Sequence, residues 1–434
     1  MLRLAAPLAL AELGWMTMGI VDSIMAGRIG AASLGAGSLG TMVFYPIVIA
    51  ATGMLLGMDT LVAQAHGAND RMETRRSLIA GLWVGIALTP VTVLLILGLM
   101  PLLRAVGTTP RVMELLLPYT KALCWGIGSL MLFAAFRRYL QALDIVKPVM
   151  FALVSANLIN VFGNWLLMYG HWGFRAMGLE GSGWSTSISR FYMAGVLLIV
   201  IVRHEAQTGN LISAMSWRPD LERIRRLAGL GLPAALQMLF EGAVFGIVTV
   251  FAGTLDEVSL AAHSIAVQVI ATTFMVPLGI SSAAAVRVGQ AAGRKDSHGA
   301  ARAGWTGLLL STIFMGTAGI CMALAPRAIV RLFIADTAVV ASGGLLVRIA
   351  ALFELFDGFQ IVSTGALRGL GDTRSAMIAH LVGYWLLGIP IIYVLCYPLH
   401  WGVTGIWVGL TAALMLIGSL LVASWKRAVR GLSN

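Results

Sequence analysis

The residues of this chain that could do chemistry are acids placed inside long apolar stretches. Six of the 19 acidic residues lie well within such stretches, namely Glu12, Asp22, Asp59, Glu241, Glu354 and Asp357. A charged side chain near the centre of a bilayer costs about 2.5–3.5 kcal/mol on insertion scales, so it normally faces a protein interior or a water-filled path. These acids therefore predict a pathway through a membrane protein.

Two of these acids, Glu241 and Asp357, lie near the middle of their apolar stretches. Two carboxylates at mid-depth can bind a cation together, or one of them can hold a proton. We therefore predict a Na⁺ or H⁺ coupling site at this pair. Glu354 and Gln360, each three positions from Asp357, are secondary candidates for the same site. The alternative interpretation is that both carboxyls are buried and hydrogen-bonded between helices.

A second candidate site combines Asp22 with Asn157, Asn160 and Asn164. Spacings of three and four place the three asparagines on one face of a helix. Side-chain carbonyl oxygens and one carboxylate suit a hard cation or a proton. The competing interpretation is an amide ladder that joins helices within the bilayer.

Glu12 and Asp59 are secondary candidates that a structural role would explain equally well. The seven histidines form no metal-spaced pair, and the three cysteines lie far apart in apolar surroundings. No nucleophile elbow or phosphate-binding loop is present. We expect no enzyme, no cofactor, and no metal other than a coupling Na⁺.

The elements that must position these residues are membrane-spanning helices. The chain has 434 residues, of which 59% are hydrophobic and 11% charged, whereas soluble domains are about a quarter charged. A span needs roughly 20 apolar residues. Twelve such stretches predict an all-α membrane protein, at approximately 4–27, 36–63, 78–100, 113–136, 148–170, 180–202, 227–253, 259–285, 303–325, 343–366, 375–397 and 402–425.

The net charge of +11 is interpreted as an orientation signal. When loops are assigned alternately to the two sides, most basic residues, including Arg75, Arg137 and Arg138, fall in loops on the side of the N-terminus. The positive-inside rule then places both termini in the cytoplasm. We expect a multi-pass protein of the inner membrane that contacts lipid and binds no nucleic acid.

An internal repeat predicts two lobes. Residues 4–7 match 230–233 and residues 62–65 match 288–291 at the same offset. Two six-helix halves in the same orientation are related by a pseudo-two-fold axis along the membrane normal, with the substrate path between them. We therefore predict lobes at 1–203 and 227–434, joined by a charged cytoplasmic linker at 204–226.

Five motifs in this order resemble those of the multidrug and toxic compound extrusion (MATE) family over essentially the whole chain. They are Gly19–Gly27, Leu61–Ala68, Arg138–Ala142, Gly178–Gly183 and Gly365–Thr373. The resemblance implies twelve helices in two lobes that open alternately to the cytoplasm and the outside. It also implies cation-driven export of drugs and organic cations.

By the same resemblance, Glu241 and Asp357 match the second-lobe acids that bind the coupling cation in bacterial multidrug members, and Asp22 and Asn160 match the first-lobe site. The position matched to Asn164 is often aspartate in the family, and here an amide removes that charge.

Our hypothesis is a cation-coupled antiporter for small lipophilic or cationic substrates, functional as a monomer. A lipid-linked sugar flippase is the alternative within the same superfamily, and it would favour a basic central cavity over the acidic interior found here. A membrane enzyme is the alternative from another class.

Overall fold

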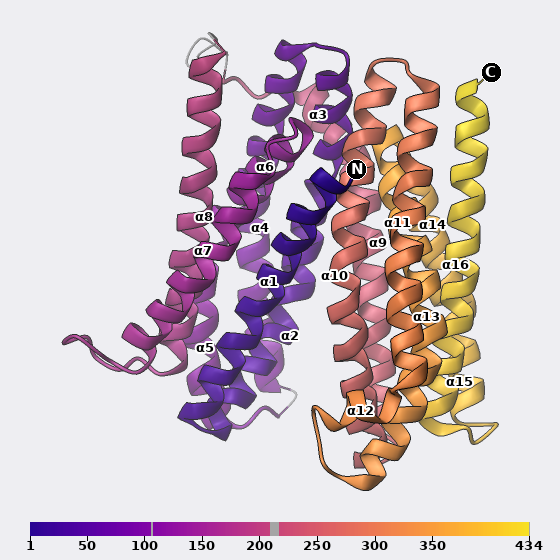
Figure 1. The fold of residues 1–434 in the computed structure, drawn as a ribbon. Helices are drawn as coiled ribbons and strands as arrows, with labels where there is room; N and C mark the ends of the chain where they lie inside the picture. The colour runs from indigo at the N-terminus through magenta and orange to yellow at the C-terminus, as the bar shows by residue number, and fades with distance from the viewer. Residues whose placement is uncertain (106, 209–216, 434) are drawn as a thin grey trace. The chain divides into compact units, whose positions relative to one another are not determined.

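The computed structural model describes residues 1–105, 107–208 and 217–433, and within these ranges it contains helices and no strands. The described residues form two compact units, and Figure 1 shows the helices of each one. The first unit is Leu10–Ala235, and the second is Met1–Ala9 with Leu236–Asn434. The expected lobe boundaries stay a prediction, and residues 209–216 of the expected linker lie outside the described residues.

The helices of the first unit are largely continuous through the apolar stretches, because each stretch is long enough to satisfy its own backbone within hydrocarbon. They are α1 (Leu2–Ile29), α2 (Ala31–Met54), α3 (Gly57–Gly67), α4 (Arg71–Ala105), α5 (Pro110–Trp125), α6 (Ile127–Ala142), α7 (Lys147–Gly163), the π-helix η1 (Asn164–Met168) and α8 (Leu179–Gln207). The first residues of α1, up to Ala9, belong to the second unit.

Helix α9 (Leu221–Gly253) begins in the first unit and ends in the second. The remaining helices of the second unit are α10 (Glu257–Gly293), α11 (Ser297–Leu324), α12 (Pro326–Arg331), α13 (Thr337–Leu370), α14 (Arg374–His380), the π-helix η3 (Leu381–Gly388), α15 (Ile389–Cys396) and α16 (Gly402–Ser433).

The predicted all-α membrane fold is confirmed. Eleven helical segments of the described chain are long and apolar enough to cross a membrane, and α5 with α6 forms a twelfth if this pair, bent by 42°, counts as one span. The bend lies at Gly126, where a Cβ atom would approach Ser187 Oγ to 2.7 Å. A glycine at this position therefore allows α8 to pack closely against the bend.

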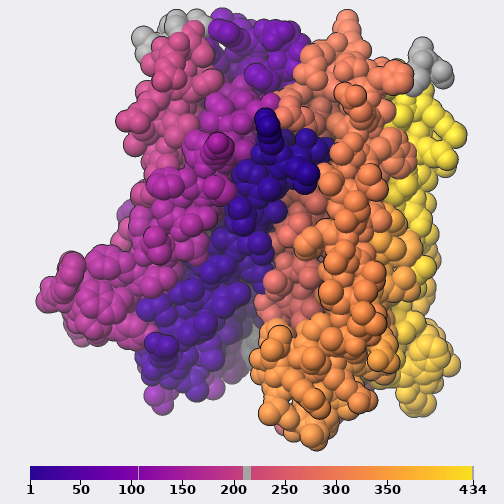
Figure 2. Space-filling view, in the orientation of Figure 1, coloured from indigo at the N-terminus to yellow at the C-terminus, as the bar shows by residue number. Residues whose placement is uncertain are grey.

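Aromatic residues mark one end of the first unit. The segment between η1 and α8 projects from this unit (Figure 2). Trp165 stacks on His171 with ring centroids 4.1 Å apart, and Trp172 is 76% exposed. Amphipathic rings are enriched at membrane–water interfaces, so this end is the expected site of one bilayer boundary.

At the other end of the first unit, acids pair with arginines. Arg137 on α6 forms a buried ion pair with Glu12 on α1, and Arg138 Nη1 lies 3.3 Å from Asp59 Oδ2 on α3. Arg75 belongs to α4. The expectation that Arg75, Arg137 and Arg138 lie in loops is therefore wrong. They lie within helices because buried acids on neighbouring helices offset the cost of burying their charge.

In the second unit, α13 packs closely on α10 through small residues. A Cβ atom on Gly365 would overlap the Ser281 carbonyl oxygen and lie 2.9 Å from its carbonyl carbon. One turn later, a Cβ atom on Gly369 would lie 2.5 Å from the Ala285 carbonyl oxygen. Small residues four positions apart allow two membrane helices to approach at backbone distance.

We expect Gly365→Leu to lower the stability of the protein by about 1–3 kcal/mol, because the added carbons overpack the α10–α13 contact. The measurement is the thermal unfolding midpoint in detergent. Gly316→Leu on α11 is the control, because a Cβ atom there would have no neighbour within 4 Å. Equal midpoints for the two variants would contradict the close helix contact.

We expect Arg137→Met to cost about 3–5 kcal/mol of stability, because it leaves Glu12 buried without its partner. Adding Glu12→Gln to the same chain removes the unpaired charge and recovers most of the loss. Both variants are compared by unfolding in detergent, with the exposed Arg111→Met as control. If the double variant were as unstable as Arg137→Met, the pair would not explain the burial of Glu12.

Candidate cation-coupling sites

The first candidate site brings together the two acids singled out in the second unit. Gln360 on α13 connects them, because its Nε2 donates to Glu241 Oε1 at 2.9 Å and to Asp357 Oδ1 at 3.2 Å. Asp357 is 5% exposed and Gln360 is fully buried. The two carboxyls therefore share one neutral amide donor.

Two further residues that the sequence interpretation missed complete this site. Gln237 Nε2 donates to Glu241 Oε2 at 2.9 Å, and His380 Nε2 lies 3.5 Å from the same oxygen. The other ring nitrogen, His380 Nδ1, lies 2.8 Å from the Ala376 carbonyl oxygen. Because a carbonyl can only accept, we assign the hydrogen of the neutral ring to Nδ1, which leaves Nε2 as a hydrogen-bond acceptor.

Gln237 was detectable from the sequence, because it stands four positions before Glu241 and so lies on the same helix face. No spacing pointed to His380, since α14 follows α9 by more than a hundred residues. His380 reaches Glu241 only because α14 packs near α9 in the folded structure.

Glu354 lies apart from this network. It is fully buried, and Thr273 Oγ1 on α10 donates to its Oε1 at 2.6 Å. Among the described residues, its other carboxyl oxygen has no hydrogen-bond partner. The spacing of three placed Glu354 near Asp357 along α13, but no hydrogen bond between the described atoms links the two acids.

The second candidate site surrounds Asp22 on α1, in the first unit. Asn164 Nδ2 donates to Asp22 Oδ1 at 2.6 Å, and Thr186 Oγ1 on α8 donates to Asp22 Oδ2 at 3.0 Å. Asn160 Nδ2 in turn lies 3.3 Å from Thr186 Oγ1. Asn160 and Asn164 are both fully buried. Each carboxylate oxygen therefore accepts from a neutral donor, and Thr186 is a member that the sequence interpretation missed.

The local backbone helps to place these amides. Asn164 begins the π-helix η1 at the end of α7, and π-turns are frequent at functional sites because they redirect side chains. Ser185 Oγ donates to the Asn160 carbonyl oxygen at 2.7 Å, which fixes α8 against this turn. Asn164 Nδ2 also lies 3.3 Å from Asn160 Oδ1.

Asn157, predicted on the same face, points elsewhere. Its Nδ2 donates to the carbonyl oxygens of Gly14 and Leu153, both at 2.9 Å. This contact joins α7 to α1 and matches the amide-ladder interpretation for this one residue. Glu12 and Asp59 likewise lie outside both clusters, in contact with Arg137 and Arg138.

The two clusters share one electrostatic property. Within the described ranges, Asp22, Glu241 and Asp357 make no ion pair with lysine or arginine, and their partners are neutral amides, a hydroxyl and a histidine. Such a carboxyl can take up a proton or, with amide oxygens beside it, a monovalent hard cation. No group of three or more His, Cys, Asp or Glu arranged to hold a metal ion occurs in the described part of the chain.

Comparison with known proteins gives the family. The model of the MatE family matches residues 7–166 and 233–394. A "Probable multidrug resistance protein NorM" of Mesorhizobium japonicum is 35% identical over 99% of this chain and 93% of its own length. The "Multidrug resistance protein NorM" of Burkholderia vietnamiensis is 35% identical over 98% of this chain and 92% of its own length.

Solved structures show the same fold at lower identity. The outward-facing conformation of a multidrug resistance MATE family transporter of the MOP superfamily superimposes with a TM-score of 0.90 and 18% identity, covering 100% of this chain and 96% of that chain. The eukaryotic MATE transporter AtDTX14 gives a TM-score of 0.86 at 19% identity, covering 99% and 97%. With the family model matched in both halves, this chain is a multi-pass membrane transporter, not an enzyme, and it belongs to the MatE family.

Proposed function

We propose that this chain is a cation-coupled antiporter that exports drugs and organic cations by alternating access. The observation that carries the proposal is the pair of carboxyl clusters on helices long and apolar enough to cross a membrane, whose acids are held by neutral donors. The names of the relatives, which are multidrug resistance proteins, support drugs as the substrates. The coupling ion is H⁺ or Na⁺.

The proposed mechanism is competition between two cations for the same negative charges. A carboxylate that has bound H⁺ or Na⁺ cannot stabilise a drug cation at the same time, so each cation displaces the other. Export follows if the outward-facing state binds the coupling ion better and the inward-facing state binds the drug better, because coupling requires differential affinity between two states.

The driving forces are adequate for this exchange. A tenfold drug gradient costs about 1.4 kcal/mol, and one charge that moves inward through 100 mV supplies about 2.3 kcal/mol. One net charge per cycle would therefore suffice. An electroneutral exchange would have to depend on the ion gradient alone.

We assign Glu241 and Asp357 as the coupling pair of the second unit, positioned by Gln360. Asp22, with Asn160 and Asn164, is the corresponding candidate in the first unit. Glu354 stays a secondary candidate because it is buried with a single hydroxyl partner.

We leave Glu12, Asp59 and Asn157 out of the coupling sites, because each is engaged by other groups of the first unit. The proposed setting is the inner membrane, with both termini in the cytoplasm together with the helix ends that carry Arg75, Arg137 and Arg138. The proposed functional unit is the monomer. The acidic clusters disfavour a flippase for lipid-linked pyrophosphates, which needs basic partners for its cargo.

We expect Asp357→Asn and Glu241→Gln to slow ethidium transport at least about tenfold, because an amide takes up no proton and lacks the negative charge that attracts Na⁺. The assay is ethidium movement in inverted membrane vesicles under an imposed pH gradient or an imposed Na⁺ gradient. The gradient that supports transport by the unaltered chain identifies the coupling ion.

Glu257→Gln is the matched control, since Glu257 is an exposed acid in the first turn of α10 and should leave transport unchanged. Normal transport by both amide variants under either gradient would rule out this site assignment.

A further inference from the structure

One buried acid of the second unit lies outside the network of Glu241 and Asp357. Glu354 lies near the middle of α13 and is fully buried. Its Oε1 lies 2.6 Å from Thr273 Oγ1 on α10, whereas its Oε2 has no hydrogen-bond partner among the described residues. No lysine, arginine or histidine of the described ranges forms an ion pair with Glu354. A carboxylate here would hold a full charge with one hydrogen bond.

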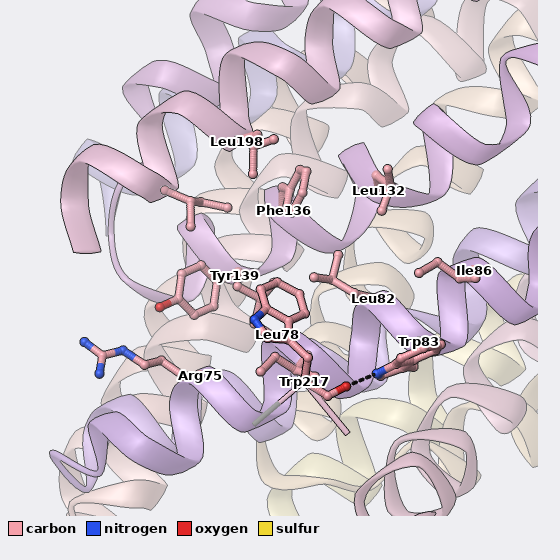
Figure 3. Close-up of a pocket in the computed structure, with 12 residues that line it drawn as sticks. Arg75, Leu78, Leu82, Trp83, Ile86, Leu132, Phe136, Tyr139, Leu198 and Trp217 are labelled. Carbon is pink, nitrogen blue, oxygen red and sulfur yellow. Dashed lines mark hydrogen bonds between the residues drawn. The ribbon is translucent and has the colours of Figure 1, made fainter. Parts of the chain in front are cut away.

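Glu205 on α8, in the first unit, shows what a buried and charged glutamate requires. It is 4% exposed, Arg75 Nη2 lies 2.6 Å from its Oε2, and Tyr139 Oη donates to its Oε1 at 2.7 Å. Figure 3 shows Arg75 and Tyr139 at the side of an apolar pocket between α4, α6 and α8. Both oxygens of Glu205 have a partner, and one partner carries the opposite charge, as a buried charge needs. Glu354 has no counter-charge and no second donor.

The groups around Glu354 do not supply the missing charge. Asp357 stands one turn later on α13 and shares Gln360 with Glu241, so both of these neighbours are acids, and like charges disfavour a third negative charge. Helices α10, α11, α12, α14 and α16 pack against α13. Apart from two buried histidines, the lysine, arginine and histidine side chains of these helices and of α13 are exposed or belong to the last two turns of their helix.

The two buried histidines on these helices are engaged elsewhere. His263 lies in the second turn of α10, where Trp407 Nε1 donates to its Nδ1 at 3.2 Å and its Nε2 lies 3.0 Å from Thr249 Oγ1. His380 on α14 approaches Glu241 at 3.5 Å. Since an indole can only donate, His263 is neutral on its Nδ1 side and offers no positive charge to the middle of α13.

The hydroxyl of Thr273 indicates where the hydrogen of its contact with Glu354 lies. Thr273 Oγ1 also lies 2.9 Å from the Ile270 carbonyl oxygen and 3.2 Å from the Val269 carbonyl oxygen, and a hydroxyl has one hydrogen to donate. An ionised Glu354 can only accept, so that single hydrogen would be its whole stabilisation. A protonated Glu354 donates to Thr273 Oγ1 instead, and the threonine then donates to Ile270. This second arrangement leaves only a neutral carbonyl oxygen without a partner, which costs far less than an unpaired charge.

We propose that Glu354 is a proton-binding site of the second unit, which holds a proton in this conformation and exchanges it with water during the transport cycle. A proton needs one oxygen atom, whereas a hard metal cation needs several oxygen ligands, and the carboxyl of Glu354 has one hydroxyl as its partner. This proton is additional to the cation assigned to Glu241 and Asp357. The exchange step rests on the proposed antiport, whereas the presence of the proton does not.

Infrared difference spectroscopy of the purified chain at neutral pH tests the presence of the proton. A free glutamate is ionised at this pH, so the C=O band of a protonated carboxyl identifies the bound form. We expect the Glu354 band to be lost in Glu354→Gln and kept in Asp357→Asn. Thr273→Val removes the acceptor of the acid hydrogen and should move the band to higher frequency.

Thr272→Val is the matched control for the threonine variant, because the Thr272 hydroxyl donates to the Gln268 carbonyl oxygen at 2.8 Å and should leave the band in place. Glu354→Gln keeps the shape of the side chain and an N–H that can donate to Thr273, so it should fold normally. Identical protonated-carboxyl bands in the unaltered chain and in Glu354→Gln would overturn the proposal.

Proton counting in vesicles that contain a pH-sensitive dye tests the exchange. We expect Glu354→Gln to move about one proton fewer for each ethidium transported, because an amide takes up no proton. Glu257→Gln, at an exposed acid of α10, should match the unaltered chain. Equal counts for Glu354→Gln and the unaltered chain would overturn the exchange step. If the unaltered chain showed the Glu354 band but moved no proton with ethidium, proton antiport would be wrong and Glu354 would be a permanently neutral acid.

Discussion

The central constraint on this molecule is that a carboxyl group in hydrocarbon must find a partner or give up its charge. The first unit meets this constraint in two ways. Near the basic helix ends, Glu12 and Asp59 face arginines, which fixes their charge. Further along α1, Asp22 is bound by an amide and a hydroxyl, which stabilise a charge without neutralising it. The proposed cation exchange needs the second arrangement, in which no lysine or arginine of the described ranges forms an ion pair with the acid.

The second unit repeats this arrangement with different residues. Glu241 and Asp357 share the amide of Gln360, and Gln237 and His380 approach Glu241 from the other side. The helices that carry these groups are held by close contacts such as Gly365 against Ser281. Close packing thus keeps the donors in place, while the absence of a lysine or arginine partner in the described ranges keeps the carboxyls exchangeable. In this account, antiport follows from the choice of neutral donors.

Much of this was predictable from the sequence, because a hydrophobic stretch of spanning length permits only a helix. The twelve stretches followed from length, and spacing placed Asn160 and Asn164 on one helix face. The assignment of Asp22 and Asn160 to one site was implied by the family resemblance. Asn157 has the same spacing but binds the backbone of α1, since helix rotation decides which of two neighbouring amides reaches an acid. Thr186 and His380 were missed because they reach the acids from other helices, whose rotation the sequence does not give. The pairing of Glu12 and Asp59 with arginines likewise depends on which helices are neighbours in the fold.

Cation release on drug binding is the most direct test of the exchange. Calorimetric titration of the purified protein with ethidium, repeated in buffers of different ionisation enthalpy and at several Na⁺ concentrations, counts the ions released. Our account predicts that each ethidium bound releases H⁺ or Na⁺, and that Asp357→Asn removes this release. Tight binding of ethidium with no ion released by the unaltered protein would show that the two cations do not compete, and the exchange mechanism would be wrong.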